Sequence, residues 1–264
     1  MAQQCLNASN QYFTFPALNV TVPPVTFSLW INTAAIVAKD TALFCWRGAV
    51  NTAVFLLYIA PNWELRYFVG GGTQWQTATA LAVSTGVWQH VCVAISSSQA
   101  RLYLDGSSFT NNTSHSSANI NETGNLARDP FVSPSHTSFS GSIAEAAVWT
   151  AALPDAECRA LGKRFSPLCL QHRLHDLVFY KDLIRDDNRG VGPALTAVNS
   201  PSVAAHPPQI HPHSRMNARS KPAHFLSPFR LSKAAADASR MMAGGAALRG
   251  AASGVIHPIG EVSS

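Results

Sequence analysis

The chain has 264 residues, of which 47% are hydrophobic and 12% charged, and its formal net charge is +5. A chain of this length can bury one substantial core and still have tens of residues outside it. No apolar run approaches the ~20 residues of a membrane-spanning helix, which argues against a membrane protein. Residues 1–170 carry no net charge, so the whole excess lies in residues 171–264.

The first residues show no targeting segment. Met1–Gln4 carry no positive charge, and polar residues arrive too early for the apolar core of a secretory signal. We therefore expect synthesis in a host cytoplasm without a signal peptide. Five cysteines agree with a reducing compartment, because their number is odd and no CxxC pair occurs. Cys158 and Cys169 flank a predicted short helix and could pair if exposed to an oxidant.

Strand patterns begin clearly at Trp88. Residues Trp88–Ile95 alternate two largely apolar faces, which predicts a central strand covered on both sides. Arg101–Leu104 reads as a second strand, and Asp105-Gly106 follows it at once. Because that dipeptide accepts the positive φ values of a tight turn, we expect a hairpin with Ser107–Thr110.

A third strand and a short helix follow. Ile143, Glu145 and Ala147 alternate with small residues, which predicts a strand that another layer approaches closely. Leu153–Glu157 (LPDAE) predicts the start of a helix, since a proline fixes φ in a first turn and acids favour its positive end.

The order of these motifs resembles the closing half of a laminin-G-like domain of the concanavalin A-like lectin/glucanase superfamily. Phe13–Phe15 and Val25–Ile31 are similar to the opening strands of that family, and Ala42–Trp46 and Ala53–Ile59 fit the strands between. The resemblance covers roughly residues 8–165 and implies an all-β fold, a two-sheet antiparallel jelly-roll sandwich. Function does not follow from it, because this scaffold hosts lectins, adhesion modules, enzymes and structural parts.

Changes of composition suggest three segments. We place the sandwich in residues 1–170, and in 171–204 we expect added short strands, Leu177–Tyr180 and Ala194–Val198, packing on the sandwich or on a partner. This second segment resembles the sequence that follows laminin-G-like domains in tailed-bacteriophage proteins, which steers the interpretation toward a virion component.

Residues 205–264 are basic and rich in proline and alanine, which predicts an extended arm with a short helix over Ser232–Arg249. The arm is expected to meet an acidic protein surface and to order on contact. Its charges are too sparse and its aromatics too few for nucleic acid. The residues expected to bind the partner are Arg215, Arg219, Lys221, Phe225, Phe229 and Arg230.

No catalytic residue is assigned. Glucanases on this scaffold need paired carboxylates flanking a glycosidic bond, and the Glu-x-Asp-x-Glu signature is absent. Glu145 stands alone among small residues, and Glu64 fits better as a partner of Arg66. We therefore predict that the protein is not an enzyme, with a glycanase as the third alternative.

No cofactor or metal is assigned either. The histidine spacings His172-x-x-His175 and His211-Pro-His213 could chelate zinc, but no cysteine or carboxylate completes four ligands. His90 is read as a sheet residue that hydrogen-bonds through one ring nitrogen. Calcium is common at the loop rims of related sandwiches, yet no clustered acids appear here, and no residue can be assigned to it.

A sugar site would need aromatic stacking beside amides and flexible backbone. Trp46, Trp63 and Trp75 are candidates, although the first two equally fit a core. The expected ligand-binding residues are Trp75, Gln74, Gly71 and Asp40.

These patterns lead to one main hypothesis and one main rival. The first is a non-enzymatic structural or decoration protein of a phage-like virion, oligomeric, localised in the virion and attached through its arm to other capsid or tail proteins. The rival is a carbohydrate-binding adhesin that recognises host cell-surface glycans.

Overall fold

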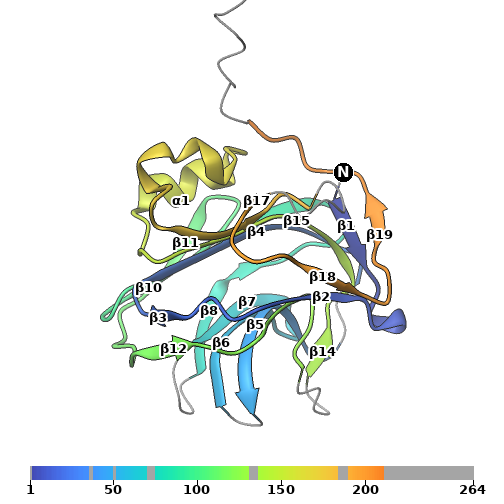
Figure 1. Cartoon of the computed structure of the whole chain (residues 1–264), viewed down its shortest axis with the longest axis horizontal. Coiled ribbons are helices and arrows are strands. Elements are labelled where there is room, and N and C mark those ends of the chain that lie inside the picture. Colours follow the sequence, from blue (N-terminus) through green and yellow to red (C-terminus); the bar gives the residue numbers. More distant parts are fainter. Residues whose placement is uncertain are drawn as a thin grey trace, which may run out of the picture. The chain divides into compact units, whose positions relative to one another are not determined.

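The computed structural model describes residues 2–35, 38–49, 52–69, 75–130, 136–183 and 190–210. All of these belong to one compact unit, residues 1–212. Two β-sheets pack face to face, and the short helix α1 (Asp155–Gly162) lies on the outer side of the first sheet (Figure 1). The predicted all-β, two-sheet antiparallel sandwich is confirmed. No helix among the described residues is long and apolar enough to cross a membrane.

The first sheet has its main strands in the spatial order β11 (Ser107–Asn111), β10 (Ala100–Leu104), β9 (Trp88–Ile95), β4 (Val25–Thr33), β15 (Gly141–Trp149), β1 (Ala2–Cys5) and β19 (Ser202–Ala204). In addition, β16 (Leu177–Lys181) pairs with β15, and β17 (Gly190–Val191) pairs with β16. All of these pairings are antiparallel.

The second sheet has the order β18 (Thr196–Val198), β2 (Tyr12–Phe15), β13 (Gly124–Leu126), β5 (Asp40–Ala49), β6 (Thr52–Ile59), β7 (Glu64–Val69) and β8 (Trp75–Ala82). A short parallel strand, β14 (His136–Ser138), also pairs with β5. Beside the two sheets, β3 (Val20–Val22) pairs with β12 (Ala118–Ile120). Short 3-10 turns cover Asn7–Ser9, Pro167–Cys169 and Gln171–Arg173.

Aromatic side chains from both sheets fill the space between them. Phe27 of β4 stacks on Phe55 of β6, with ring centroids 3.7 Å apart. Trp46 of β5 is fully buried beside them, 5.2 Å from Phe27 and 5.4 Å from Phe44. Such large apolar rings each remove much surface from water, so these pairs hold the two layers together. Trp46 is therefore a core residue, and its candidacy as a sugar-stacking ring was wrong.

Strand β9 and its hairpin follow the sequence prediction. Val91 and Val93 point into the core between the sheets, whereas Cys92 and Ala94 belong to the cluster beneath α1. β9 lies between β10 and β4 and is covered on both faces, as expected of a central strand. The turn from β10 to β11 has φ values of +50° at Asp105 and +80° at Gly106, which confirms the predicted hairpin.

Strand β15 departs from simple alternation. Its pairing with β4 shifts between Ala144 and Ala147, and Glu145 at this bulge has a φ of +53°. A bulge inserts one residue, so residues after it change faces. As a result Ile143 points into the core between the sheets, and Ala147 joins the cluster beneath α1. The prediction that Ile143 and Ala147 share a face was wrong for this reason.

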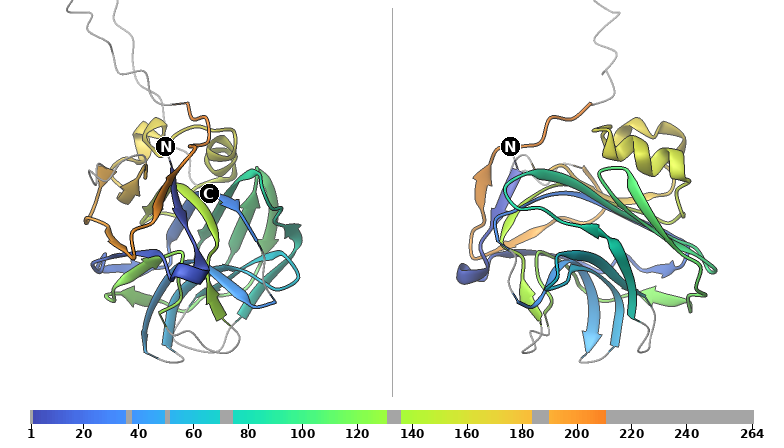
Figure 2. Two further views of the ribbon diagram at one scale, coloured as in Figure 1. Left: turned by 90° about the vertical axis from the view of Figure 1, so that its right-hand side faces the viewer. Right: turned by 180° about the vertical axis from the view of Figure 1, so that it is seen from behind.

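Four short strands after α1 join both sheets. β16 continues the edge of β15 beyond β1, β18 pairs with β2, and β19 pairs with β1. Figures 1 and 2 show β19 lying beside the N-terminal strand. In the described chain, residues 202–210 therefore run along the sandwich; we call this segment the strap. The predicted boundaries at 170 and 204 remain predictions, and the predicted helix over Ser232–Arg249 lies outside the described residues.

Candidate binding site

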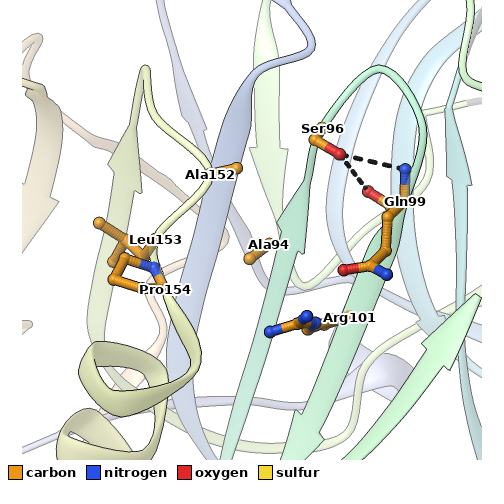
Figure 3. Close-up of a pocket in the computed structure, with 7 residues that line it drawn as sticks. All are labelled: Ala94, Ser96, Gln99, Arg101, Ala152, Leu153 and Pro154. Carbon is orange, nitrogen blue, oxygen red and sulfur yellow. Dashed lines mark hydrogen bonds between the residues drawn. The ribbon is translucent and has the colours of Figure 1, made fainter.

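A pocket of about 170 Å³ opens on the outer face of the first sheet (Figure 3). It lies between strands β9 and β10 and the connection from β15 to α1. Its volume is below the roughly 300–1,000 Å³ of pockets that take drug-sized ligands, so it suits one small chemical unit. The lining residues are Ala94, Ser96, Gln99, Arg101, Ala152, Leu153 and Pro154.

One wall of the pocket is polar and is built by the turn between β9 and β10. The Ser96 hydroxyl donates to the carbonyl oxygen of Gln99 and accepts from the Gln99 amide, both at 3.1 Å. The Gln99 side chain is held in turn, because its Nε2 donates to Asn112 Oδ1 at 2.6 Å. The hydroxyl and amide therefore sit on a turn that is fixed before any ligand arrives.

The opposite wall is apolar and is anchored to strand β4. The Thr26 hydroxyl donates to the carbonyl of Ala151 at 2.7 Å and accepts from the backbone N–H of Leu153 at 2.9 Å. These two bonds position Leu153 and Pro154 across from Gln99. Pro154 then caps α1 with an extended backbone, φ −66° and ψ 160°, so it precedes the first helical residue.

Arg101 supplies the one charge among the seven lining residues. It lies near the buried hydroxyl of Tyr103 and favours a lower pKa there, and that hydroxyl donates to Asp155 Oδ1 at 3.2 Å. Asp155 is also bound by Arg159, whose Nε lies 2.7 Å from Oδ2. The Arg159 hydrogen bond is the largest cause that lowers the pKa of Asp155, and Arg101 adds to it. Burial raises the pKa of Tyr103, so its hydroxyl keeps its proton.

This arrangement can bind but has no groups for hydrolysis. The seven lining residues include a hydroxyl, an amide and a guanidinium, and they include no carboxylate, histidine or cysteine. A glycosidase needs an acid and a second carboxylate on either side of the bond that is cleaved. Polar groups beside an apolar wall are what a small polar ligand with one apolar face requires.

A second polar cluster lies on the same side of the first sheet but is sealed. The Glu145 side chain is 1% exposed, and its Oε2 accepts from the hydroxyls of Tyr180 at 2.9 Å and Ser166 at 3.4 Å. Its Oε1 accepts no hydrogen bond, and the strap brings His206 Nε2 to 3.3 Å from it. We call Glu145, Ser166, Tyr180 and His206 the Glu145 cluster. A substrate cannot reach this carboxylate.

The histidine of the Glu145 cluster faces oxygen atoms on both ring nitrogens. Its Nδ1 lies 2.6 Å from the carbonyl of Pro207, and its Nε2 lies 3.3 Å from the carbonyl of Asp182. A neutral imidazole can donate from one nitrogen only. The ring therefore donates to one of these two carbonyls in its neutral form and to both in its protonated form.

Of the four predicted ligand residues, Asp40 is the one whose side chain is described, and it does not line the pocket. Asp40 begins β5 in the second sheet and is half-buried, close enough to Tyr58 to raise the pKa of that phenol after the larger effect of burial. Trp75 begins β8 in the second sheet, but its side chain lies outside what is described. Gly71 and Gln74 also lie outside the described residues, as do the six predicted arm residues. These assignments remain predictions.

Three further sequence interpretations can be checked. Glu64 does pair with Arg66, at 3.0 Å. His90 does bond through one ring nitrogen, with Nε2 2.8 Å from the Ser28 hydroxyl, and no partner reaches Nδ1. Trp63 is 40% exposed in the turn before β7. It therefore faces solvent, unlike Trp46.

The sequence interpretation missed the pocket itself, although Ser96–Gln99 (SSSQ) is a polar turn between two strong strand patterns.

Cysteine and metal chemistry find little support in the described part of the chain. Cys158 contacts Cys92 beneath α1 and not Cys169, and all five cysteines are free thiols. Cys169 instead donates to the carbonyl of Ile210 in the strap at 3.0 Å. No three His, Cys, Asp or Glu side chains gather within the described ranges as a metal site would require, so calcium still has no assigned residue.

Comparisons with known proteins identify the family of this fold. Residues 7–159 match a laminin-G family model described as the concanavalin A-like lectin/glucanases superfamily. A putative carbohydrate binding protein from Bacteroides ovatus is 15% identical, with a TM-score of 0.50; the alignment covers 76% of this chain and 61% of that chain. No curated protein matches the chain.

Two further structures share the fold at lower scores. A SAP-like pentraxin from Limulus polyphemus is 17% identical, with a TM-score of 0.48, over 58% of this chain and 75% of that chain. Domains LG4-5 of the mouse laminin alpha1 chain are 19% identical, with a TM-score of 0.44, over 56% of this chain and 40% of that chain. At these identities the likeness concerns the fold alone.

Proposed function

We propose, because this chain belongs to the concanavalin A-like lectin/glucanases superfamily, that it is a non-catalytic binding module whose ligand is a carbohydrate. The observation that carries the proposal is the composition of the pocket. Gln99 and Arg101 offer hydrogen bonds on one side, and Leu153 and Pro154 offer an apolar surface on the other.

A sugar ring matches these two walls. Its hydroxyls need both donors and acceptors, which the side-chain amide of Gln99 supplies, and Arg101 adds donors. Its C–H face packs on apolar side chains, here Leu153 and Pro154. The pocket volume of about 170 Å³ fits a single sugar unit better than a run of a polysaccharide chain.

A glycan array with matched variants tests the proposal. The double change Gln99→Ala and Arg101→Ala removes two polar lining groups and should lower the affinity for any bound glycan at least about tenfold, since each lost hydrogen bond weakens binding. Ser98→Ala is the matched control, because Ser98 is exposed in the same turn and does not line the pocket. Equal loss in the control, or no glycan bound by the native protein, would overturn the proposal.

The glycanase alternative has less support. Its best candidate carboxylates are Glu145, which is enclosed, and Glu64, which lies in the other sheet and pairs with Arg66. We expect no turnover when the protein is incubated with any polysaccharide that it binds. Turnover that survives Glu145→Gln and Glu64→Gln would show that other carboxylates are catalytic.

A structural role on a phage-like virion is the second candidate, with other capsid or tail proteins as partners. It is favoured by one observation: the net charge is zero over residues 1–170 and +5 over residues 171–264. A chain shortened after Pro212 keeps the whole described unit. If the basic segment is the attachment arm, the shortened chain should fold but fail to enter particles. Unchanged incorporation would contradict the anchoring role.

A further inference from the structure

The pocket carries an uncompensated positive charge. Arg101 lines it, and the nearby carboxylate of Asp155 is already bound by Arg159 Nε at 2.7 Å. Arg159 also donates to the carbonyl of Gly106 and to the Ser108 hydroxyl at 3.1 Å, so it is tied to the β10–β11 turn and away from the pocket. With one acid and two guanidiniums in this group, one positive charge is left, and it faces the cavity.

Arg101 is also held in place before a ligand binds. It lies close enough to Tyr103 and Asp155 to lower the pKa of each, and the Tyr103 hydroxyl is itself fixed because it donates to Asp155 Oδ1 at 3.2 Å. Tyr103 is fully buried and cannot swing aside. A guanidinium with restricted motion loses less entropy on binding than a free one, which favours selective recognition.

We propose that the pocket selects sugars that bear a carboxylate, with Arg101 pairing to that group and the side-chain amide of Gln99 binding a hydroxyl. This inference rests on the proposed function and names its ligand class. Arginine binds carboxylates through paired, charge-assisted hydrogen bonds that are stronger than bonds between neutral groups. A neutral sugar leaves the charge of Arg101 without a counter-ion, so the pocket discriminates by charge and not by size.

The test compares three ligands that share one ring. Methyl galacturonide supplies the carboxylate, its methyl ester removes the charge at nearly equal size, and methyl galactoside removes the group. Isothermal titration should show the acid binding at least about tenfold more tightly than the ester, as one charge-assisted bond predicts. A parallel arm with a nonulosonic acid and its methyl ester asks whether the carboxylate comes from a hexuronic or a nonulosonic sugar.

Two variants and a control assign the selectivity. Arg101→Gln should bring the acid-to-ester ratio to about one while the ester still binds. Tyr103→Phe should lower the ratio with little effect on the ester, because the hydroxyl lies beside Arg101 and does not line the pocket. Lys163→Gln makes the same change of charge at an exposed site that directly follows α1 and does not line the pocket, and it should leave the ratio unchanged.

Each failure has its own signature. Equal binding of acid and ester would overturn the carboxylate inference and leave sugar binding intact. An acid preference that survives Arg101→Gln would also overturn it, since another group would then hold the carboxylate. Binding of acetate as tight as binding of the sugar acid would show an anion site without sugar recognition. No binding by any of these ligands, combined with an empty glycan array, would overturn the proposed function itself.

Discussion

The pocket and the Glu145 cluster lie on the same side of the first sheet, yet they treat polar groups in opposite ways. At the pocket, a hydroxyl, an amide and a guanidinium line an open cavity that holds no carboxylate. In the Glu145 cluster, a carboxylate is enclosed by two hydroxyls and a histidine from the strap. Both regions contain polar side chains, but solvent reaches only those of the pocket. Solvent access is therefore what separates the candidate binding site from the structural cluster.

The largest effect should come from emptying the enclosed cluster. Glu145→Ala removes the acceptor of the buried Tyr180 and Ser166 hydroxyls, and each donor left unsatisfied costs about 1–3 kcal/mol, or about 2–6 kcal/mol together. Urea unfolding should therefore show a free energy of unfolding lower by about this amount. Glu64→Ala is the control, because its partly exposed pair with Arg66 is worth about 1 kcal/mol or less. Equal losses of stability in Glu145→Ala and Glu64→Ala would mean that the enclosed cluster does not stabilise the fold more than an exposed ion pair does.

A second test follows stability against pH and concerns His90, a buried residue of β9, the strand that also supplies Ala94 to the pocket. Burial lowers the pKa of His90 to about 3, whereas in the unfolded chain histidine titrates near 6.5. As pH falls below about 6.5, the unfolded chain takes up a proton that the folded chain refuses. Stability present above that pH is therefore lost toward pH 3, by about 3 kcal/mol at pH 4.

The matched variant for this test is His90→Gln, which cannot take up the proton. Its unfolding free energy should change less with pH than that of the native protein between pH 7 and 4, measured by urea unfolding. Parallel curves for the two proteins would mean that His90 is charged in the fold.

A smaller effect is expected from loosening the strap. His206→Gln removes one of the two carbonyl contacts of the ring, which should cost about 1 kcal/mol, the typical net value of a hydrogen bond. Because Cys169 bonds to Ile210 in the strap and is the half-buried one of five otherwise buried cysteines, thiol labelling of Cys169 should become several-fold faster. His172→Gln, at an exposed histidine, should leave the labelling rate unchanged.

The smallest effect on stability belongs to the pocket. Gln99→Ala should change the free energy of unfolding by no more than about 0.5 kcal/mol, as for surface positions, although we expect it to weaken ligand binding. Thermal melting with and without ligand separates the two effects. A loss of several kcal/mol in the ligand-free protein would mean that Gln99 serves the fold and would erase the difference between the regions.

Local patterns in the sequence predicted much of the sandwich. The alternation in Trp88–Ile95 identified both faces of β9, and Asp105-Gly106 identified the turn that follows β10, because each signal arises within a few neighbouring residues. The bulge at Glu145 could not be predicted this way. Glutamate has no preference for positive φ, and the residues that enclose it arrive from 21 to 61 positions along the chain.

The candidate site was harder to predict than the fold. Aromatic and glycine-rich signals led to Trp75 and Gly71, whereas the pocket combines a serine-rich turn with a proline connection that lies more than fifty residues later. Only the pairing of β15 with β4, and of β4 with β9, brings Leu153 opposite Gln99. Trp46 shows the opposite error, a candidate site residue that is buried. A tryptophan that stacks on a sugar and one that fills a core look alike in sequence.

The strap also determines how the sandwich would carry a mechanical load. Tension applied beyond Ile210 would first meet the backbone bonds that Ile210 makes with Arg164 and Ser166, then the pair between His206 and Glu145, and last the β19–β1 ladder. The three fastenings act in series, so the chain would yield one fastening at a time. Strands β9 and β10, which floor the pocket, lie off this path toward the opposite edge of the sheet.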